Sequence, residues 1–406
     1  MRIFKNELIK GTAVLFIALN IFNFLNLIFN FLMGRMLGPA GYGVLATLMS
    51  FIYIYAIPSE AIQTLVAKYA SKFKAKKEEN KTKYLMKIFL KRGVALSIIL
   101  FLLLMVISIF LSDKLGIDYW LIILINLTVF VVFIGPVTRG IMQGRKKFGA
   151  FGYSFVIESL VKVVASVLLV YFGFGILGAV HGVLLGIFVG LLLSFYFCKD
   201  IIKRKSEKTS FVNVKATPYF IVMWAILLLF SMDIIFAKYF FSADLAGKYA
   251  VISIIGKIIY LGTNSISKSM FPFSAERKES GESSSNILFK SLGVTLGLSL
   301  IGIIFYFLIP NFIVNILYGQ VYLEIAKYIA YSGIAFMFLS LSNIILMYQL
   351  SIDEIKRSWI IVIPVLIQIG MFILWHSTIE KFLFALIISN VIMFIFSFLF
   401  FRRSKI

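Results

Sequence analysis

The chain has 406 residues, of which 61% are hydrophobic and 14% are charged, and its formal net charge is +22. Such an apolar composition excludes an ordinary soluble globular domain. The single cysteine, Cys198, excludes a disulfide framework and a metal site built from cysteines.

Apolar runs recur along the whole chain, each long enough to form a helix that crosses a membrane, which takes about 20 residues. We predict twelve spans, near residues 11–34, 42–66, 89–112, 118–138, 153–172, 176–198, 217–239, 245–270, 287–309, 327–348, 358–376 and 381–401. The first run is too long for the apolar region of a cleaved signal peptide, so we expect it to be retained.

Lysine and arginine are distributed unevenly between the loops. We assign the loops alternately to two sides of a membrane and count basic residues near the span ends with the adjoining loop. Of the 40 basic residues, 32 then lie on the side that carries both termini, six lie on the other side, and two, Lys162 and Lys257, lie deep within spans. Cytoplasmic loops are enriched in these residues, so we predict a cell (plasma) membrane protein with both termini in the cytoplasm. The charge therefore requires no nucleic acid partner, and it favours anionic membrane lipids.

The first hairpin, residues 11–68, carries a stripe of amides within an arc of roughly 120° on one helix face, formed by Asn20, Asn23, Asn26 and Asn30. An unpaired amide that faces lipid costs a few kcal/mol, so we expect the stripe to face protein or a water-filled cavity. The amides either hold helices together or line a substrate path, where amides can donate to and accept from sugar hydroxyls.

Two charged residues of the same hairpin are candidates for function. Arg35 lies at the outer mouth, where it is either an interfacial anchor or a phosphate ligand. Glu60 follows Pro58 in the inner third of the second span, and either couples transport to H+ or Na+ or forms a structural pair.

The fifth span contains Glu158 and Lys162, which are four residues apart with the acidic residue first. This order favours an ion pair on one helix face. We predict a structural ion pair, with a role in a substrate cavity as the alternative.

The seventh and eighth spans contain Asp233 and Lys257, whose depths below the outer surface differ by about 6 Å at the rise of an α-helix, a distance that a lysine stem bridges. Either they form an interhelical pair, or Lys257 binds a substrate phosphate while Asp233 acts as its counter-ion or as a cation site. One polar helix face is formed by Ser253, Lys257, Tyr260, Asn264 and Lys268, and we therefore place Asn264 with Lys257 among the substrate-binding candidates.

No catalytic, metal or nucleotide site is predicted. His181 and His376 are isolated and lack a metal-binding spacing. The sequence has no phosphate-binding loop of the Walker type, so we expect no cofactor.

The two halves of the chain are similar. A shift of 206 residues places Ala40-Gly41 over Ala246-Gly247. We predict a six-helix lobe at 1–198, a basic cytoplasmic linker at 199–216 and a second six-helix lobe at 217–406. Because each half would contain an even number of spans, a pseudo-two-fold axis normal to the membrane should relate the lobes. The predicted fold is thus an all-α polytopic membrane protein with about 12 transmembrane helices.

Four segments resemble one family of transporters: Gly34–Gly43, Arg139–Arg145 with Glu158–Lys162, Asp233–Ile235 with Ala246–Tyr249, and Leu317–Tyr322. They are similar to segments of the polysaccharide/oligosaccharidyl-lipid flippase family, the polysaccharide transport branch of the multidrug/oligosaccharidyl-lipid/polysaccharide exporter superfamily. The resemblance covers nearly the whole chain. It implies two lobes that face a central cavity and that export lipid-linked glycans by alternating access.

The resemblance and the residues together predict a monomeric flippase that is not an enzyme. We expect it to move a polyprenyl-(pyro)phosphate-linked oligosaccharide from the inner to the outer leaflet. A multidrug/cation antiporter of the same fold is the first alternative, and it would need more unpaired acidic groups. An integral-membrane glycan polymerase or glycosyltransferase is the second, and it would need a large extramembrane loop with paired carboxylates, whereas the outer loops here are short.

Overall fold

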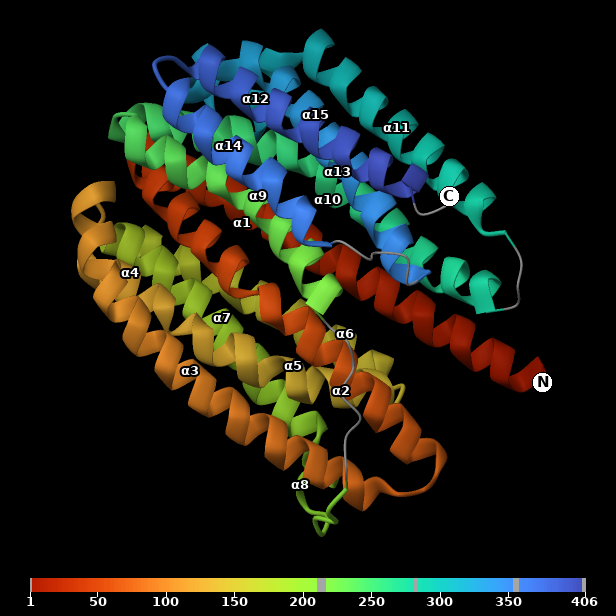
Figure 1. The fold of residues 1–406 in the computed structure, drawn as a ribbon. Coiled ribbons are helices and arrows are strands. Elements are labelled where there is room, and N and C mark those ends of the chain that lie inside the picture. Colours follow the sequence, from red (N-terminus) through yellow and green to blue (C-terminus); the bar gives the residue numbers. More distant parts are fainter. Residues whose placement is uncertain (1, 210–216, 280–282, 353–357, 404–406) are drawn as a thin grey trace. The chain divides into compact units, whose positions relative to one another are not determined.

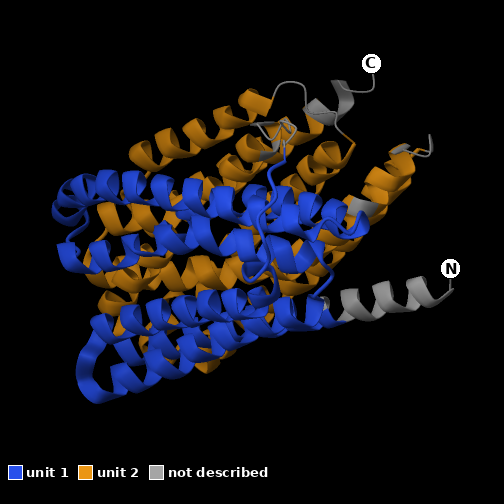
Figure 2. Ribbon diagram, turned by 90° about the horizontal axis from the view of Figure 1, so that it is seen from below, with its two compact units in different colours: residues 1–37, 51–215 blue, residues 38–50, 216–406 orange. Residues whose placement is uncertain are grey.

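The computed structural model describes residues 2–209, 217–279, 283–352 and 358–403 (Figure 1). Every regular element within these ranges is a helix, so the predicted all-α class is confirmed. The chain forms two compact units (Figure 2): unit 1 contains residues 1–37 and 51–215, and unit 2 contains residues 38–50 and 216–406.

The helices of the first half of the chain are α1 (Arg2–Tyr55), α2 (Ile57–Ala75), α3 (Glu79–Leu115), α4 (Tyr119–Asn126), α5 (Thr128–Gly144), α6 (Phe148–Leu169), the π-helical η1 (Val170–Phe174), α7 (Gly175–Phe197) and α8 (Lys199–Ile202). Those of the second half are α9 (Thr217–Phe240), α10 (Ala243–Glu279), α11 (Ser285–Leu308), α12 (Pro310–Tyr318), η2 (Gln320–Tyr328), α13 (Ile329–Ser351), η3 (Ser358–Ile361), α14 (Val362–Leu374) and α15 (Ile379–Arg403), where η2 and η3 are 3-10 helices.

Nine helical stretches of the described residues are long and apolar enough to cross a membrane. Two of them, Ile17–Ala75 and Phe148–Phe197, each contain two of the predicted spans, and the shorter apolar stretch Ser358–Leu374 lies at the predicted eleventh span. All twelve apolar runs therefore fall on helices, as the predicted fold requires.

The turn predicted between the first two spans is reduced to one residue. Gly38 alone has non-helical backbone angles within α1 (φ 66°, ψ 177°), and Pro39 begins the next helical segment. A positive φ strains any residue that has a Cβ, and proline is well tolerated in the first helical turn because its missing N–H has no helical acceptor there. The chain enters unit 2 at this point and returns to unit 1 after Ser50.

Glycines bring two helix pairs of unit 1 into backbone contact. On α7 they recur every fourth residue and share one face, at Gly178, Gly182, Gly186 and Gly190. A Cβ at Gly182 would lie 2.2 Å from Ser166 Oγ of α6. On α5, a Cβ at Gly144 would lie 2.3 Å from the carbonyl oxygen of Ala67 in α2. Small residues at such positions are the usual means by which membrane helices approach closely.

Helix α13 is the central helix of unit 2. Most residues of α3 in unit 1 are not buried, whereas most residues of α13 are. It packs on α10, α11 and α15, and a Cβ at Gly256 of α10 would lie 2.1 Å from Ser332 Oγ of α13. Polar side chains on these buried faces therefore contact other helices of unit 2.

Residues 38–50 pack inside unit 2. A Cβ at Gly247 of α10 would lie 1.7 Å from the carbonyl oxygen of Pro39, and a Cβ at Gly43 would lie 2.8 Å from the backbone nitrogen of Gly247. The buried hydroxyl groups of Tyr42 and Tyr318 are 3.2 Å apart. The start of the second predicted span is thus a component of unit 2.

Candidate functional site

Side chains from α1, α5 and α6 form a charged cluster in unit 1. The guanidinium of Arg139 donates to the carboxylate of Glu158, and these side chains are 14% and 12% exposed. The ammonium of Lys162 is buried and donates to the side-chain oxygen of Asn26. We call these four residues the unit 1 cluster.

Glu158 has a partner that the sequence did not predict. It forms a direct ion pair with Arg139, and Lys162, four residues along the same helix, attracts the same carboxylate. The structural pair of Glu158 with Lys162 stays a prediction. Gly190 of α7 lies opposite, and a Cβ there would lie 2.4 Å from Glu158 Oε2, so the missing side chain leaves room for the carboxylate. The stem of Lys162 extends toward α1, where its Nζ lies 4.3 Å from the ring centroid of Phe29.

The asparagine stripe divides into two pairs. Asn20 and Asn23 are exposed, whereas Asn26 and Asn30 are partly buried. Asn26 and Asn30 each donate a side-chain N–H, over 2.8 Å, to the carbonyl oxygen four residues earlier. Asn26 also accepts a hydrogen bond from Lys162. One amide of the stripe therefore orients a cation, and both interpretations of the stripe stay predictions.

The unit 1 cluster has more hydrogen-bond donors than acceptors. It contains two cations and one carboxylate. The Nε–H of Arg139 is buried and has no hydrogen-bond partner among the residues that the structure describes. A guanidinium offers five N–H donors and an ammonium three. The arrangement is thus suited to an additional anion.

Unit 2 contains a second charged group, which is almost completely buried. Lys257 Nζ lies 3.0 Å from Asp233 Oδ1, and the carboxylate also accepts from Ser253 Oγ at 2.5 Å and from the hydroxyl of Tyr249 at 3.3 Å. The ring centroid of Phe230 lies 4.8 Å from Lys257 Nζ. The two charges satisfy each other, which agrees with the interhelical pair and with Asp233 as a counter-ion.

The polar face of α10 becomes more exposed along the helix. Ser253, Lys257 and Tyr260 are buried, Asn264 is partly buried, and Lys268 is exposed. The side-chain oxygen of Asn264 accepts from the amide of Asn343 at 3.2 Å. Any ligand of Lys257 would have to displace its carboxylate partner, so its phosphate-binding role stays a prediction.

Comparison with known proteins identifies the family. Residues 8–278 match the sequence profile of the polysaccharide biosynthesis protein family. The chain belongs to this family. Among curated proteins, no significant match to the sequence was found. The polysaccharide biosynthesis family agrees with the resemblance seen in the sequence.

Solved structures of MOP-superfamily transporters resemble this polysaccharide biosynthesis family member. An inward-facing multidrug resistance MATE family transporter has 16% identity, 94% coverage of each chain and a TM-score of 0.74. A MATE protein in its straight conformation has 15% identity, 99% coverage of this chain, 96% of its own and a TM-score of 0.68. A MOP superfamily transporter from Pyrococcus furiosus has 16% identity, the same coverages and a TM-score of 0.64. The likeness shows the fold, a two-lobed bundle of membrane-spanning helices. Family and fold together support a multi-pass membrane exporter.

The other predicted residues of this polysaccharide biosynthesis protein lie elsewhere in the chain. Arg35 is exposed in α1, three residues before the break at Gly38, and Glu60 is exposed in the first turn of α2. His181 is exposed, and the ring of His376 stacks on Phe240 with 4.0 Å between centroids. Within the described ranges, no group of three or more His, Cys, Asp or Glu residues could hold a metal ion.

Two residues of the unit 1 cluster region were not predicted as site residues. Arg139 follows the apolar run 118–138 and was noted only as part of a family-like segment. Gly190 belongs to the four-residue glycine repeat of α7, which was visible in the sequence as a close-packing signal. Neither the position of Arg139 nor the glycine repeat identifies the residue on another helix that each contacts.

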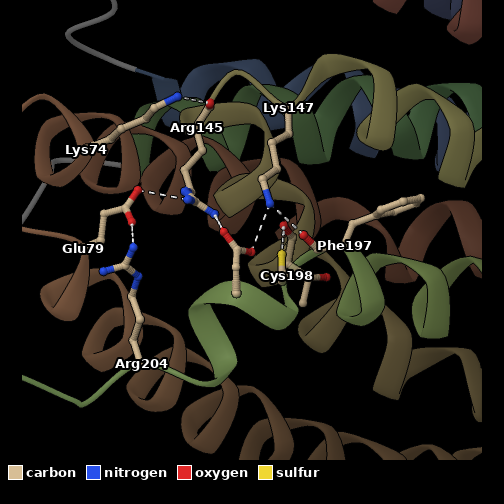
Figure 3. A network of polar contacts seen from close by, with 9 residues as sticks. Lys74, Glu79, Arg145, Lys147, Phe197, Cys198 and Arg204 are labelled. Carbon is tan, nitrogen blue, oxygen red and sulfur yellow. Dashed lines mark hydrogen bonds and ion pairs between the residues drawn. The ribbon is translucent and has the colours of Figure 1, made fainter. Parts of the chain in front are cut away.

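A larger network of ion pairs and hydrogen bonds joins helix ends of unit 1 (Figure 3), and its members are Lys74, Glu79, Arg145, Lys147, Asp200 and Arg204. Arg145 follows α5 and is 9% exposed. Its guanidinium lies 2.9 Å from Glu79 and 2.5 Å from Asp200. The network thereby ties the end of α5, which carries Arg139, to α3 and α8.

We expect this network to contribute stability that is lost in acid. Burial raises the pKa of Asp200, but hydrogen bonds and charges from Arg145 and Lys147 outweigh burial and hold that pKa below its usual value. Because the folded-state pKa is the lower one, the contribution is complete above the unfolded-state pKa and disappears as the pH falls through the folded-state value. The side chain is 40% exposed, so solvent screening limits the effect to about 1 kcal/mol.

Thermal unfolding of purified protein tests this expectation. From about pH 6 down to about pH 3, the unfolding temperature of wild type should fall further than that of Asp200→Asn. Equal slopes for the two proteins would contradict it.

Proposed function

We propose that the protein moves a polyprenyl phosphate- or pyrophosphate-linked oligosaccharide from the inner to the outer leaflet by alternating access. The observation that carries this proposal is the excess of cationic donors in the unit 1 cluster of a polysaccharide biosynthesis family member. Arg139 and Lys162 bind the phosphate group, and exposed amides such as Asn20 and Asn23 contact the glycan. The lipid tail stays in the bilayer.

Physical chemistry supports an anionic ligand at this cluster. A charge in the middle of a membrane costs about 2.5–3.5 kcal/mol on insertion scales. Lys162 lies inside the predicted span 153–172 and donates to a neutral amide, so it marks a functional position. Arginine binds phosphate through two parallel N–H donors, and lysine binds it as a point charge. The same cluster offers the amide of Asn26, which can serve sugar hydroxyls as donor and acceptor.

A multidrug/cation antiporter of the same fold is the alternative function, because several structural neighbours are MATE transporters. A cationic drug requires carboxylates that are not already neutralised. In both clusters of the described residues the carboxylate is paired with a cation. In the Pyrococcus furiosus transporter, a binding pocket of reversed polarity likewise suggests a different function for that protein. Charge sign therefore favours an anionic substrate here.

Leaflet translocation in proteoliposomes tests the function with a defined lipid-linked oligosaccharide. We expect Arg139→Gln and Lys162→Gln each to lower the transport rate about tenfold or more, since a hydrogen bond to a charged group contributes about 1.5–3 kcal/mol. The exposed Lys87→Gln is the matched control and should behave as wild type. Exchange of a fluorescent organic cation for H+ or Na+, without movement of the oligosaccharide, would establish the antiporter instead.

The membrane arrangement is part of the proposal. We propose that the protein is a monomer of the cell membrane with both termini cytoplasmic, and that residues 1–198 and 217–406 form its two lobes. The coupling ion is H+ or Na+, for which Asp233 and Glu60 are the candidate groups. Anionic lipids contact the basic cytoplasmic loops.

Cysteine labelling tests the topology. Cysteines introduced at positions 114 and 208 should react from outside and from inside respectively, because Lys114 ends α3 and Lys208 belongs to the basic linker. The native Cys198 is buried, which keeps background labelling low. Reaction of both introduced cysteines with an impermeant reagent from outside would refute the arrangement.

A further inference from the structure

The ion pair of the unit 1 cluster involves the same guanidinium that the proposed function assigns to the substrate phosphate. Arg139 and Glu158 are in direct contact, and Arg139 lies with its guanidinium carbon 4.1 Å from the ring centroid of Phe155. The stacked ring fixes the plane of the guanidinium. The guanidinium therefore already holds a carboxylate of the protein itself.

The carboxylate occupies a space that α7 leaves open for it. A Cβ at Gly190 would lie 2.4 Å from Glu158 Oε2 and 2.9 Å from Glu158 Cβ, so any other residue at this position would push the side chain away. The next glycine of the repeat, Gly186, brings the α7 backbone equally close, since its Cβ would lie 2.6 Å from the carbonyl oxygen of Glu158. Both partners of the pair are thus held in place by their surroundings.

The cluster has unused capacity for an anion next to this pair. The buried Nε–H of Arg139 finds no acceptor among the described residues. Lys162, one helical turn from Glu158, bonds to a neutral amide. A phosphate that contacts both cations would gain charge-assisted hydrogen bonds that Glu158 alone does not supply. It would also repel the carboxylate, since like charges a few Å apart in a low dielectric repel strongly.

We propose that Glu158 is an internal anion that occupies Arg139 in the empty transporter and competes with the substrate phosphate for it. Substrate binding displaces the carboxylate from the guanidinium, and its return promotes release. Glu158 thereby lowers the affinity for the substrate phosphate and speeds the release of substrate. Between transport cycles it keeps Arg139 paired with a carboxylate. This inference rests on the proposed function, because it assumes that Arg139 and Lys162 form the phosphate site.

The test uses the purified full-length protein in lipid nanodiscs and inorganic pyrophosphate as the probe. Calorimetry should show about tenfold tighter binding to Glu158→Gln than to wild type, a change equivalent to about 1.4 kcal/mol. Glu158→Asp keeps the charge on a shorter stem, and its affinity should be intermediate. Asp244→Asn, which removes an exposed acidic group of unit 2, is the control for a general change of charge and should bind as wild type. In proteoliposomes, Glu158→Gln should lower both KM and kcat for the lipid-linked oligosaccharide.

A double-mutant cycle separates competition from simple repulsion. If Glu158 acts by occupying Arg139, Glu158→Gln should give no gain in affinity when Arg139 is already glutamine. An equal gain in both backgrounds would show repulsion through space and would overturn the inference. So would an affinity of Glu158→Gln, or of Glu158→Asp if the first variant does not fold, that is no higher than that of wild type.

The same measurements keep the inference distinct from the proposed function. If pyrophosphate binds wild type, Arg139→Gln and Lys162→Gln alike, the phosphate site itself is wrong. If binding depends on both cations but is insensitive to Glu158, the site stands and only the competition fails.

Discussion

Asp233→Ala is expected to prevent the accumulation of folded protein. Lys257 is 4% exposed and Asp233 is 0% exposed, so the substitution leaves an ammonium buried without its partner. Removing one member of a buried ion pair costs about 3–5 kcal/mol, which is much of the stability of a typical domain. The yield of monodisperse protein and its unfolding temperature in detergent are the measurements.

The double variant Asp233→Leu with Lys257→Met distinguishes a structural role of the ion pair from a role in transport. Replacing both charges by apolar residues of similar size is often neutral or stabilising, so we expect the double variant to fold. If it also transports, the pair is structural. If it folds but does not transport, the pair serves the cycle as a charge site. Asp244→Asn removes an exposed partner of Lys248 and should cost about 1 kcal/mol or less.

Gly182→Leu is expected to disrupt the α6–α7 hairpin. Even a Cβ at this position would lie 2.4 Å from the backbone nitrogen of Ser166, and backbone cannot give way as the end of a side chain can. Overpacking costs about 1–3 kcal/mol in ordinary cores, and we expect more here because two helix backbones must separate. Separation would also move Glu158 and Lys162 on α6, so transport should be lost even in any protein that folds.

Gly149→Ala in α6, the helix that packs on α7, is the control. Nothing lies within 4 Å of a Cβ at this position. Alanine is favoured over glycine inside a helix by about 0.5–1 kcal/mol, so this variant should equal or exceed wild type in unfolding temperature. A stable, active Gly182→Leu protein would show that the hairpin is not as closely packed as described.

The helices could be predicted from the sequence because the residues that identify each helix lie within that helix. Hydrophobic runs of membrane length identify the spans, and the lack of water in the bilayer leaves helix as the available local structure. The helix boundaries that were not predicted are those that depend on a single residue. Gly38 reduces the turn expected between the spans 11–34 and 42–66 to a single residue, and Tyr119–Gly144 is divided at Leu127 into α4 and α5.

The site was less predictable because its contacts join different helices. The depth of Asp233 and Lys257 along their spans could be counted, and the structure places them in contact. Glu158 has a near cation on its own helix and another, Arg139, on α5, and local spacing identifies only the first. The carboxylate also needs the space beside Gly190, a residue on a third helix whose contribution is the absence of a side chain.

Residues 38–50 belong to unit 2, so dividing the chain near its midpoint separates them from the rest of that unit. Co-expression of fragments 1–209 and 217–406 would place the Pro39–Gly247 and Tyr42–Tyr318 contacts between two separate polypeptides. The C-terminal fragment would lack a segment of its own unit, and the buried faces of Gly247 and Tyr318 would be uncovered until that segment arrived. Split at the midpoint, this chain should therefore behave as an obligate pair of fragments, each insoluble or degraded when it is made alone.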